Sequence, residues 1–394
     1  MFGKPFTLFR MFGFSVRADW SWLVILVLIT TSFLMLFHTW YGSMHYREST
    51  YVLMALVGAF IYFASIVLHE LCHSLVARRY GLTMKGITLF LFGGVAEMEG
   101  EPASAKVEFL MAAAGPASSV LLTGVFAGLN YAGAAARWPA PVLGILGISA
   151  VMNGLLVAFN LIPGFPLDGG RVLRSALWAW KGDLRWATRI ATAIGSGFGT
   201  LLIFLGVALI YYSPINGIWS ILIGFFLRAA AKSGYRQVLI RQALEGEPVR
   251  RFMHPEVVSV PPALTLASLV EDYVYRYHYK MFPVVDGDRL VGCVSTRDVS
   301  AVPRSEWARR TVGETAGTCS PKNTITPDAD ALDALRRMTG GGPSRLIVID
   351  DGRLVGIVSL RDLLGFIALK FELDRLDALH PPVLPPVPPV VPPV

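Results

Sequence analysis

Two histidines four residues apart, with a glutamate beside the first, occur in the run His69-Glu70-Leu71-Cys72-His73. On a helix such residues share one face, so both imidazoles can reach the same metal ion. Glu70 lies beside that face and is placed to take a proton from an attacking water rather than to bind the metal. Cys72 lies off the histidine face and is interpreted as a packing residue. The run therefore predicts a metal site for a hydrolytic reaction.

A third ligand is needed, because a catalytic zinc ion commonly has three protein ligands and an open position. The candidate is Asp168, which closes the segment Asn160-Leu-Ile-Pro-Gly-Phe-Pro-Leu-Asp168-Gly-Gly. Its prolines and glycines break the helix and let the carboxylate turn back toward the histidines. An isolated Asp-Gly pair is usually a turn, so the assignment depends on the two motifs together. Asn160 is the candidate donor to the oxyanion, with Asn153 as an alternative that fits helix packing equally well.

The elements that must position these residues are long apolar segments. Of 394 residues, 54% are hydrophobic and 16% are charged, whereas ordinary soluble domains carry about 25% charged residues. About 20 apolar residues cross a bilayer as a helix. The sequence therefore predicts a polytopic α-helical membrane domain with about six transmembrane helices. They are expected near residues 21–38, 51–76, 107–131, 141–162, 188–212 and 215–231.

Basic residues lie almost entirely on one side of these spans, with only Arg47 and Arg137 on the other. The positive-inside rule then places both termini in the cytoplasm and the histidine motif at the cytoplasmic end of the second span. This topology accounts for the net charge of +7, so no nucleic-acid partner is expected. Three cysteines without a CxxC pair predict reduced thiols, and no removable signal peptide is expected at the N-terminus.

Two short features of the membrane domain each allow two interpretations. The apolar stretch 86–96 is too short to cross a bilayer. It is either a re-entrant hairpin or membrane-edge strand with its backbone covered, or an interfacial loop. A strand here could hold an extended substrate by strand addition. Gly115-Pro116 in the third span either opens space beside the metal through a proline kink or simply allows close packing.

The soluble part contains an internal repeat. Its copies share the runs Gly292-Cys-Val-Ser295-Thr-Arg-Asp298 and Gly356-Ile-Val-Ser359-Leu-Arg-Asp362. Each copy predicts an amphipathic helix, two strands joined by an Asp/Gly turn, and a serine-capped helix, hence an α/β module. We expect a membrane domain at 1–233, a linker at 234–248, repeats at 249–302 and 303–370, and a proline-rich tail at 371–394 that acts as a flexible tether.

Four motifs of the membrane domain resemble the site-2 protease family of intramembrane zinc metalloproteases. They are the histidine run, the Gly93-Gly94 hairpin, Gly115-Pro116 with Ser118, and the segment that ends in Asp168-Gly-Gly. The resemblance implies that His69, His73 and Asp168 bind one Zn2+ per chain and that Glu70 is the general base. It also implies a core of spans two to four, gated by the outer helices.

The family further implies a substrate anchored in the lipid bilayer. This would be a single-span membrane protein, such as a membrane-bound regulator or an anti-sigma factor, cleaved in or near its transmembrane segment. Cleavage of this kind releases a factor into the cytoplasm, as in regulated intramembrane proteolysis.

The repeats resemble a tandem pair of CBS domains, a Bateman module. This resemblance implies a cleft for an adenine nucleotide or S-adenosylmethionine, with Asp298 and Asp362 as candidates for the ribose hydroxyls, and a ligand that modulates cleavage. Helix capping explains the same aspartates, and a structural or homodimerising role stays open.

The competing class is a CBS-regulated membrane transporter or channel with an ion site at the two histidines. Glu70 argues against it, because transport needs no general base there. A metal sensor without turnover is a further alternative.

Overall fold

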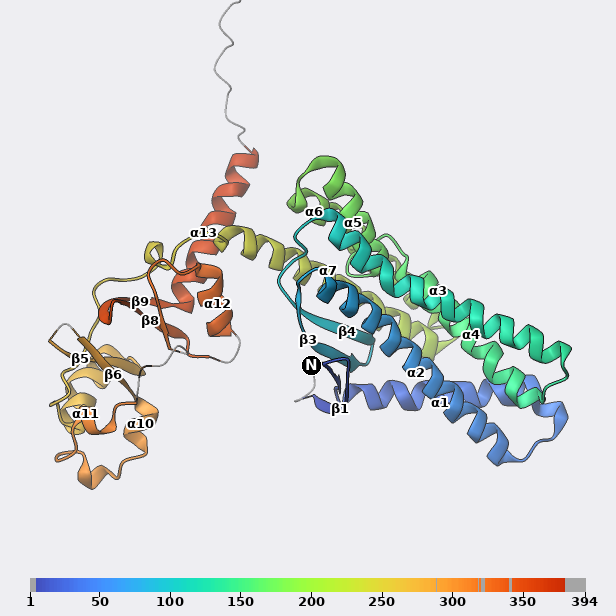
Figure 1. Ribbon diagram of the computed structural model, residues 1–394, viewed down its shortest axis with the longest axis horizontal. Coiled ribbons are helices and arrows are strands. Elements are labelled where there is room, and N and C mark those ends of the chain that lie inside the picture. Colours follow the sequence, from blue (N-terminus) through green and yellow to red (C-terminus); the bar gives the residue numbers. More distant parts are fainter. Residues whose placement is uncertain (1–4, 288, 318, 320–322, 340–341, 380–394) are drawn as a thin grey trace, which may run out of the picture. The chain divides into compact units, whose positions relative to one another are not determined.

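The computed structural model describes residues 5–287, 289–317, 319, 323–339 and 342–379 (Figure 1). The chain divides into two compact units, Met1–Val238 and Leu239–Val394. Most of the expected proline-rich tail, from His380 onward, lies outside the described residues, whereas residues 371–379 form part of a helix.

Six helices among the described residues are long and apolar enough to cross a membrane. They confirm the polytopic helical domain, and each overlaps one expected span. In chain order they are α1 (Ser21–Tyr41), α2 (Glu48–Arg79), α3 (Ala105–Ala135), α4 (Ala140–Asn160), α6 (Leu184–Leu209) and α7 (Pro214–Leu244). The amphipathic α5 (Asp168–Lys181) lies between α4 and α6 in sequence. The last span is longer than expected, because α7 continues through residues 234–244, which we assigned to a linker.

The helix ends follow from local chemistry. Ser104 accepts a hydrogen bond from the Val107 N–H and caps α3, and Asp183 does the same for α6 through the Trp186 N–H. Gly182 ends α5 with a φ of +72°, a left-handed conformation that glycine adopts without strain. A single 3-10 turn, Gly42–Met44, follows α1.

A four-stranded sheet accompanies the helices. Its order is β1-β2-β3-β4, formed by β1 (Phe6–Met11), β2 (Phe14–Ala18), β3 (Thr83–Phe90) and β4 (Gly93–Glu99). β3 and β4 form an antiparallel hairpin, and β3 pairs in parallel with β2. The stretch 86–96 is therefore a β-hairpin and not a loop. Ile87 and Leu89 of β3 are buried in clusters with residues of α2. β4 is the last strand in the order and is therefore an edge strand of the sheet.

The second unit contains a five-stranded sheet of order β5-β6-β9-β8-β7. The hairpin β5 (Met281–Asp286) and β6 (Arg289–Ser295) has the same form as β8 (Arg345–Asp350) and β9 (Arg353–Ser359), with a bulge at the equivalent place. β7 (Thr324–Ile325) pairs with β8. The repeated register and two separate hydrophobic cores confirm the α/β repeat.

Short helices complete each repeat. The expected first repeat, 249–302, contains a 3-10 turn at Val249–Arg251 and a broken helix made of α8 (Leu266–Ser268), a π-helical turn (Leu269–Val274) and α9 (Tyr275–Tyr277). It is followed by α10 (Thr296–Ser300). A 3-10 turn at Arg304–Glu306 and α11 (Val312–Thr315) lie beyond residue 302, yet Val312 packs in the same hydrophobic core as Phe282 of β5 and Val294 of β6. The second repeat contains α12 (Ala331–Thr339) and α13 (Leu360–Leu379).

Two of the three cysteines are paired, contrary to our expectation of reduced thiols. Cys293 and Cys319 form a disulfide, and Cys72 is free. Two backbone hydrogen bonds between Cys293 and Gly317, of 3.0 and 2.9 Å, bring the Cys319 segment beside β6. The two cysteines are 26 residues apart in the chain, and nothing in their spacing predicts that they lie close together.

Candidate metal centre

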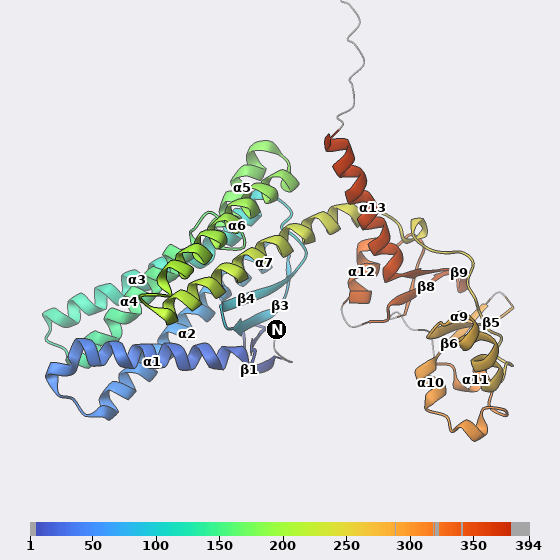
Figure 2. The ribbon, with the colours of Figure 1, turned by 180° about the vertical axis from the view of Figure 1, so that it is seen from behind.

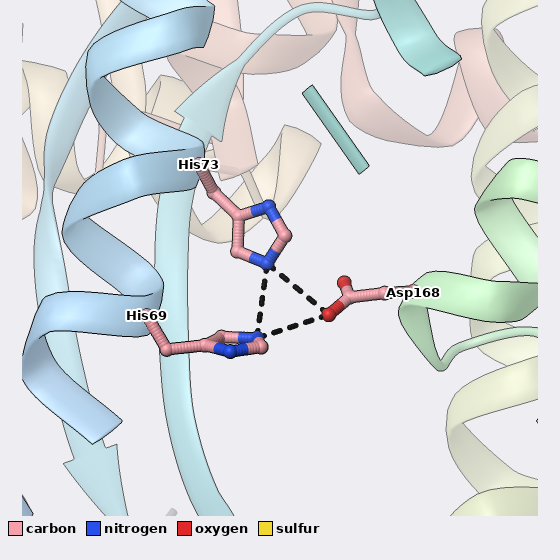
Figure 3. A group of neighbouring side chains, drawn as sticks. All are labelled: His69, His73 and Asp168. Atoms are coloured by element: carbon pink, nitrogen blue, oxygen red, sulfur yellow. Dashed lines mark hydrogen bonds and ion pairs between the residues drawn. The ribbon is translucent and has the colours of Figure 1, made fainter. Parts of the chain in front are cut away.

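His69, His73 and Asp168 come together from α2 and the first turn of α5 (Figure 3). Asp168 Oδ2 lies 3.0 Å from His69 Nε2 and 3.2 Å from His73 Nε2, and the two Nε2 atoms are 3.2 Å apart. The histidines are only 2% and 6% exposed. The sequence-predicted trio is thus a convergent set of two imidazoles and one carboxylate, the donor types that zinc prefers.

Helix α3 orients both imidazoles. His69 Nδ1 lies 2.9 Å from Ser119 Oγ, and His73 Nδ1 lies 2.6 Å from the Met111 carbonyl oxygen. Donation from each Nδ1–H to these oxygens leaves both Nε2 atoms free to bind a metal, as ligating histidines usually require. The neighbouring Ser118, which is part of the sequence motif, instead donates its hydroxyl to the Gly115 carbonyl of the same helix.

Gly115 of α3 faces the same two imidazoles. A Cβ at this position would come within 3.0 Å of both Nε2 atoms. The space in front of the ligands therefore stays open only because residue 115 has no side chain. This close approach favours a direct role for Gly115 in making room for the ion. The donor set and the open space together fit a zinc ion.

Asp168 is the first residue of α5, and its surroundings favour the deprotonated form of its carboxyl. Burial alone would raise the pKa of its carboxyl, but the two adjacent imidazoles outweigh burial and hold the pKa below its ordinary value. A deprotonated carboxylate is the form that binds a metal.

A buried ion pair holds α5 against α3. Arg174 Nε donates to Glu108 Oε1 at 2.6 Å, and the two side chains are 3% and 0% exposed. Removing one partner of such a pair costs about 3–5 kcal/mol. This pair was not predicted from the sequence, although an acidic residue inside an expected span is a signal that could have revealed Glu108.

The remaining predicted site residues of this unit differ in their surroundings. Glu70 lies against the edge strand, because a Cβ on Gly94 of β4 would meet Glu70 Cγ at 2.7 Å. Asn160 is the last residue of α4 and is half-buried. Asn153 is fully buried and donates to Ser65 Oγ at 3.2 Å, which gives it a packing role between α4 and α2.

Comparison with known proteins shows which family carries this arrangement. A family model described as Peptidase family M50 matches residues 57–136 and 130–205, and a CBS domain model matches 249–304 and 319–369. A Synechocystis protein named provisionally as a zinc metalloprotease, sll0528, is 34% identical over 357 residues, which cover 88% of this chain and 91% of that protein. The chain belongs to the site-2 protease family.

Further proteins are similar to this chain. Rip3 of Mycobacterium tuberculosis, also named provisionally as a zinc metalloprotease, is 35% identical over 90% of each chain. The zinc metalloprotease MJ0392 of Methanocaldococcus jannaschii is 31% identical and covers 79% of this chain and 86% of that protein. The solved site-2 protease from the same archaeon is 27% identical, covers 58% of this chain and 94% of its own, and has a TM-score of 0.39. This site-2 protease family member is thus a multi-pass membrane protein with tandem CBS domains, and zinc is the metal its family implies.

The second unit holds a cleft of about 590 Å³ at one of the two repeated aspartates. Asp362 lines this cleft, where its Oδ1 lies 3.2 Å from His254 Nε2. Its Oδ2 accepts hydrogen bonds from the Ser359 N–H at 2.9 Å and hydroxyl at 2.6 Å, so Asp362 also caps α13. Burial raises the pKa of Asp362, but the bonds from Ser359 and His254 lower it below its ordinary value. Asp298 closes the equivalent capping box on α10 and does not line this cleft.

Proposed function

We propose that this protein is an intramembrane zinc endopeptidase, which hydrolyses a peptide bond in or near the transmembrane segment of a membrane-anchored protein. The observation that carries the proposal is the convergence of His69, His73 and Asp168 on one point, at helices apolar enough to lie in a membrane. A general base, Glu70, follows the first ligand directly in the chain.

In this proposal His69, His73 and Asp168 hold the ion. When bound by these residues, a zinc ion would supply Lewis acidity that lowers the pKa of the attacking water far below that of free water, to about 7. Glu70 accepts the proton of the attacking water and later returns it to the leaving amine. Asn160, at the end of α4, donates a hydrogen bond to the oxyanion that forms on the scissile carbonyl.

The edge strand β4 is the proposed binding place for the substrate. A transmembrane helix hides its carbonyls in hydrogen bonds and must be extended before attack. The outer position of β4 in the sheet leaves one side of the strand without a strand partner among the described residues. Gly94 of this strand lies against Glu70. Pairing of an extended substrate with β4 would therefore bring its backbone next to the general base.

The proposed orientation places both termini and the CBS domains in the cytoplasm. It rests on the basic residues, nearly all of which lie on the side of the chain termini. A single-span protein, such as a membrane-bound regulator or an anti-sigma factor, is the proposed substrate, because its cleavage at this side releases a cytoplasmic part.

The CBS pair is proposed to modulate cleavage through an adenine nucleotide or S-adenosylmethionine. The cleft beside Asp362 is large enough for part of such a ligand, and Arg345 lies there over the Tyr279 ring at 4.5 Å. A ribose hydroxyl that bound Asp362 would take the place of His254 as the hydrogen-bonding partner of this carboxylate. A route to the membrane domain exists along the chain, since α7 ends in Ala243 and Leu244, two residues of the second repeat's core.

The proposal is tested with full-length protein in detergent and a transmembrane substrate. We expect about one zinc per chain and cleavage by the wild type. Glu70→Gln should keep the zinc and lose cleavage, while Glu48→Gln, an exposed change at the other end of α2, should leave both intact. Zinc removal by a chelator should abolish cleavage reversibly. Cleavage by Glu70→Gln at the wild-type rate, or a wild type without zinc, would contradict the proposal.

A further inference from the structure

Phe165 lies three residues before Asp168 and fixes the loop between α4 and α5 on α6. Its backbone N–H donates to the Ala191 carbonyl at 3.0 Å. A Cβ at Gly195, one turn further along α6, would come within 3.0 Å of the N, C and O atoms of Phe165. The loop backbone therefore lies directly on α6, with no room for a side chain between them.

The aromatic ring of Phe165 contacts two further helices. A Cβ at Gly234 of α7 would come within 3.0 Å of the ring atoms Cε1 and Cζ. The guanidinium carbon of Arg174 lies 5.3 Å from the ring centroid, a cation–π distance. Arg174 is itself held by the buried carboxylate of Glu108 on α3. The ring thus joins α7 to α5, the helix that begins with Asp168.

We propose that Phe165 is a positioning residue for the metal carboxylate, so that the packing of α6 and α7 on this side chain sets how tightly the chain holds its metal. Zinc–carboxylate bonds of about 2.0–2.2 Å tolerate deviations of only about 0.2 Å. A shift of the loop backbone three residues upstream is therefore enough to weaken binding. The inference rests on the proposed function in that zinc is taken as the metal.

Figure 2 shows α6 and α7 side by side. Glycines in both helices make this close contact, since a Cβ at Gly199 or Gly206 of α6 would collide with the backbone of α7 at Gly224 or Gly217. A displacement of α7 therefore has two ways to reach Phe165: directly through Gly234, and through α6. The chain continues from α7 into the CBS repeats. A displacement of α7 that arises there would reach the residues of the proposed zinc site through its contact with the Phe165 ring.

The test measures zinc per chain in full-length protein across a chelator series. Gly234→Ala inserts a methyl group against the ring, and Phe165→Leu removes the aromatic contact. We expect each to weaken zinc retention roughly 10- to 100-fold, as for other changes behind a metal ligand. The double variant should regain most of the loss, because the shorter leucine makes room for the methyl group. Gly197→Ala, with nothing within 4 Å of the new Cβ on α6, is the matched control.

A merely structural role predicts a different result. It would lower the melting temperature of each single variant and leave zinc retention by the folded fraction as in the wild type, and this would overturn the proposal. A double variant no better than Gly234→Ala would also overturn it. If Gly234→Ala does not fold, Phe165→Leu decides alone, because it adds no atoms to a packed site. Failure of the proposed function is seen separately, in a wild type without zinc or an active Glu70→Gln.

Discussion

Replacing Gly115 by alanine should weaken zinc binding without destabilising the helix that carries it. The new Cβ would come within 3.0 Å of both His69 Nε2 and His73 Nε2. Zinc–nitrogen bonds are about 2.0–2.1 Å long, so the methyl group competes with the ion for the space in front of the imidazoles. The substitution adds only one methyl group, but the space in front of the imidazoles cannot hold both this group and a zinc ion.

The magnitude follows from two opposing effects. Alanine in place of a helix-interior glycine gains about 0.8–1.0 kcal/mol of helix stability, whether or not metal is bound. Overpacking costs about 1–3 kcal/mol, and this cost falls mainly on the zinc-bound state, because free imidazoles can move away and ligated ones cannot. At about 1.4 kcal/mol per factor of ten, zinc affinity should fall roughly 10- to 100-fold while the melting temperature of the metal-free protein stays level or rises.

The assay compares zinc retention and metal-free melting temperature for Gly115→Ala and Gly124→Ala. Gly124 lies on the same helix with nothing within 4 Å of a new Cβ, so it receives the gain in helix propensity without the collision. Equal zinc retention by the two variants, whether both keep the metal or both lose it, would refute the reasoning.

Three further predictions concern residues around the two sites. Ser119→Ala should weaken zinc binding roughly 10- to 100-fold in chelator competition, because one imidazole loses its hydrogen-bond acceptor, whereas Ser118→Ala should not. Asn160→Ala should lower the cleavage rate about 10²- to 10³-fold with zinc retained, whereas Asn153→Ala should instead lower the melting temperature. Because the pKa of Asp362 is lowered in the folded protein, its stabilisation is present above about pH 4 and is lost as the pH falls; Asp362→Asn should flatten that acid-side decline in melting temperature.

The sequence predicted the elements that are defined by local pattern. Each span is an apolar run of sufficient length, and the histidine run needs only helical spacing to place two imidazoles together. The repeat was visible because both copies carry the same Asp/Gly turn and the same Ser-x-x-Asp cap. Such features depend on residues close in sequence, so no knowledge of the packing of the chain was needed.

What the sequence did not predict depends on packing between distant segments. The roles of Ser119 and of the Met111 carbonyl follow from the rotation of α3 against α2, which periodicity does not set. The strands β1 and β2 were missed, because β2 gains its place by pairing with β3 some 70 residues later, and β1 pairs only with β2. The end of α7 was placed too early, since Lys232 and the charged residues after it end a hydrophobic run but do not end a helix.

The contacts around the trio show why zinc binding is the most informative property of this site. The ligands come from α2 and α5, α3 orients the imidazoles, and α6 and α7 press on the loop that carries the carboxylate. A metal held by the proposed trio would report small movements of any of these helices, whereas the proposed general base on α2 alone would not. A signal that reaches α7 would therefore change metal retention before it changes the proton transfer at Glu70. The proposed regulation should accordingly appear first as a change in zinc exchange and only then as a change in the rate of the proposed cleavage.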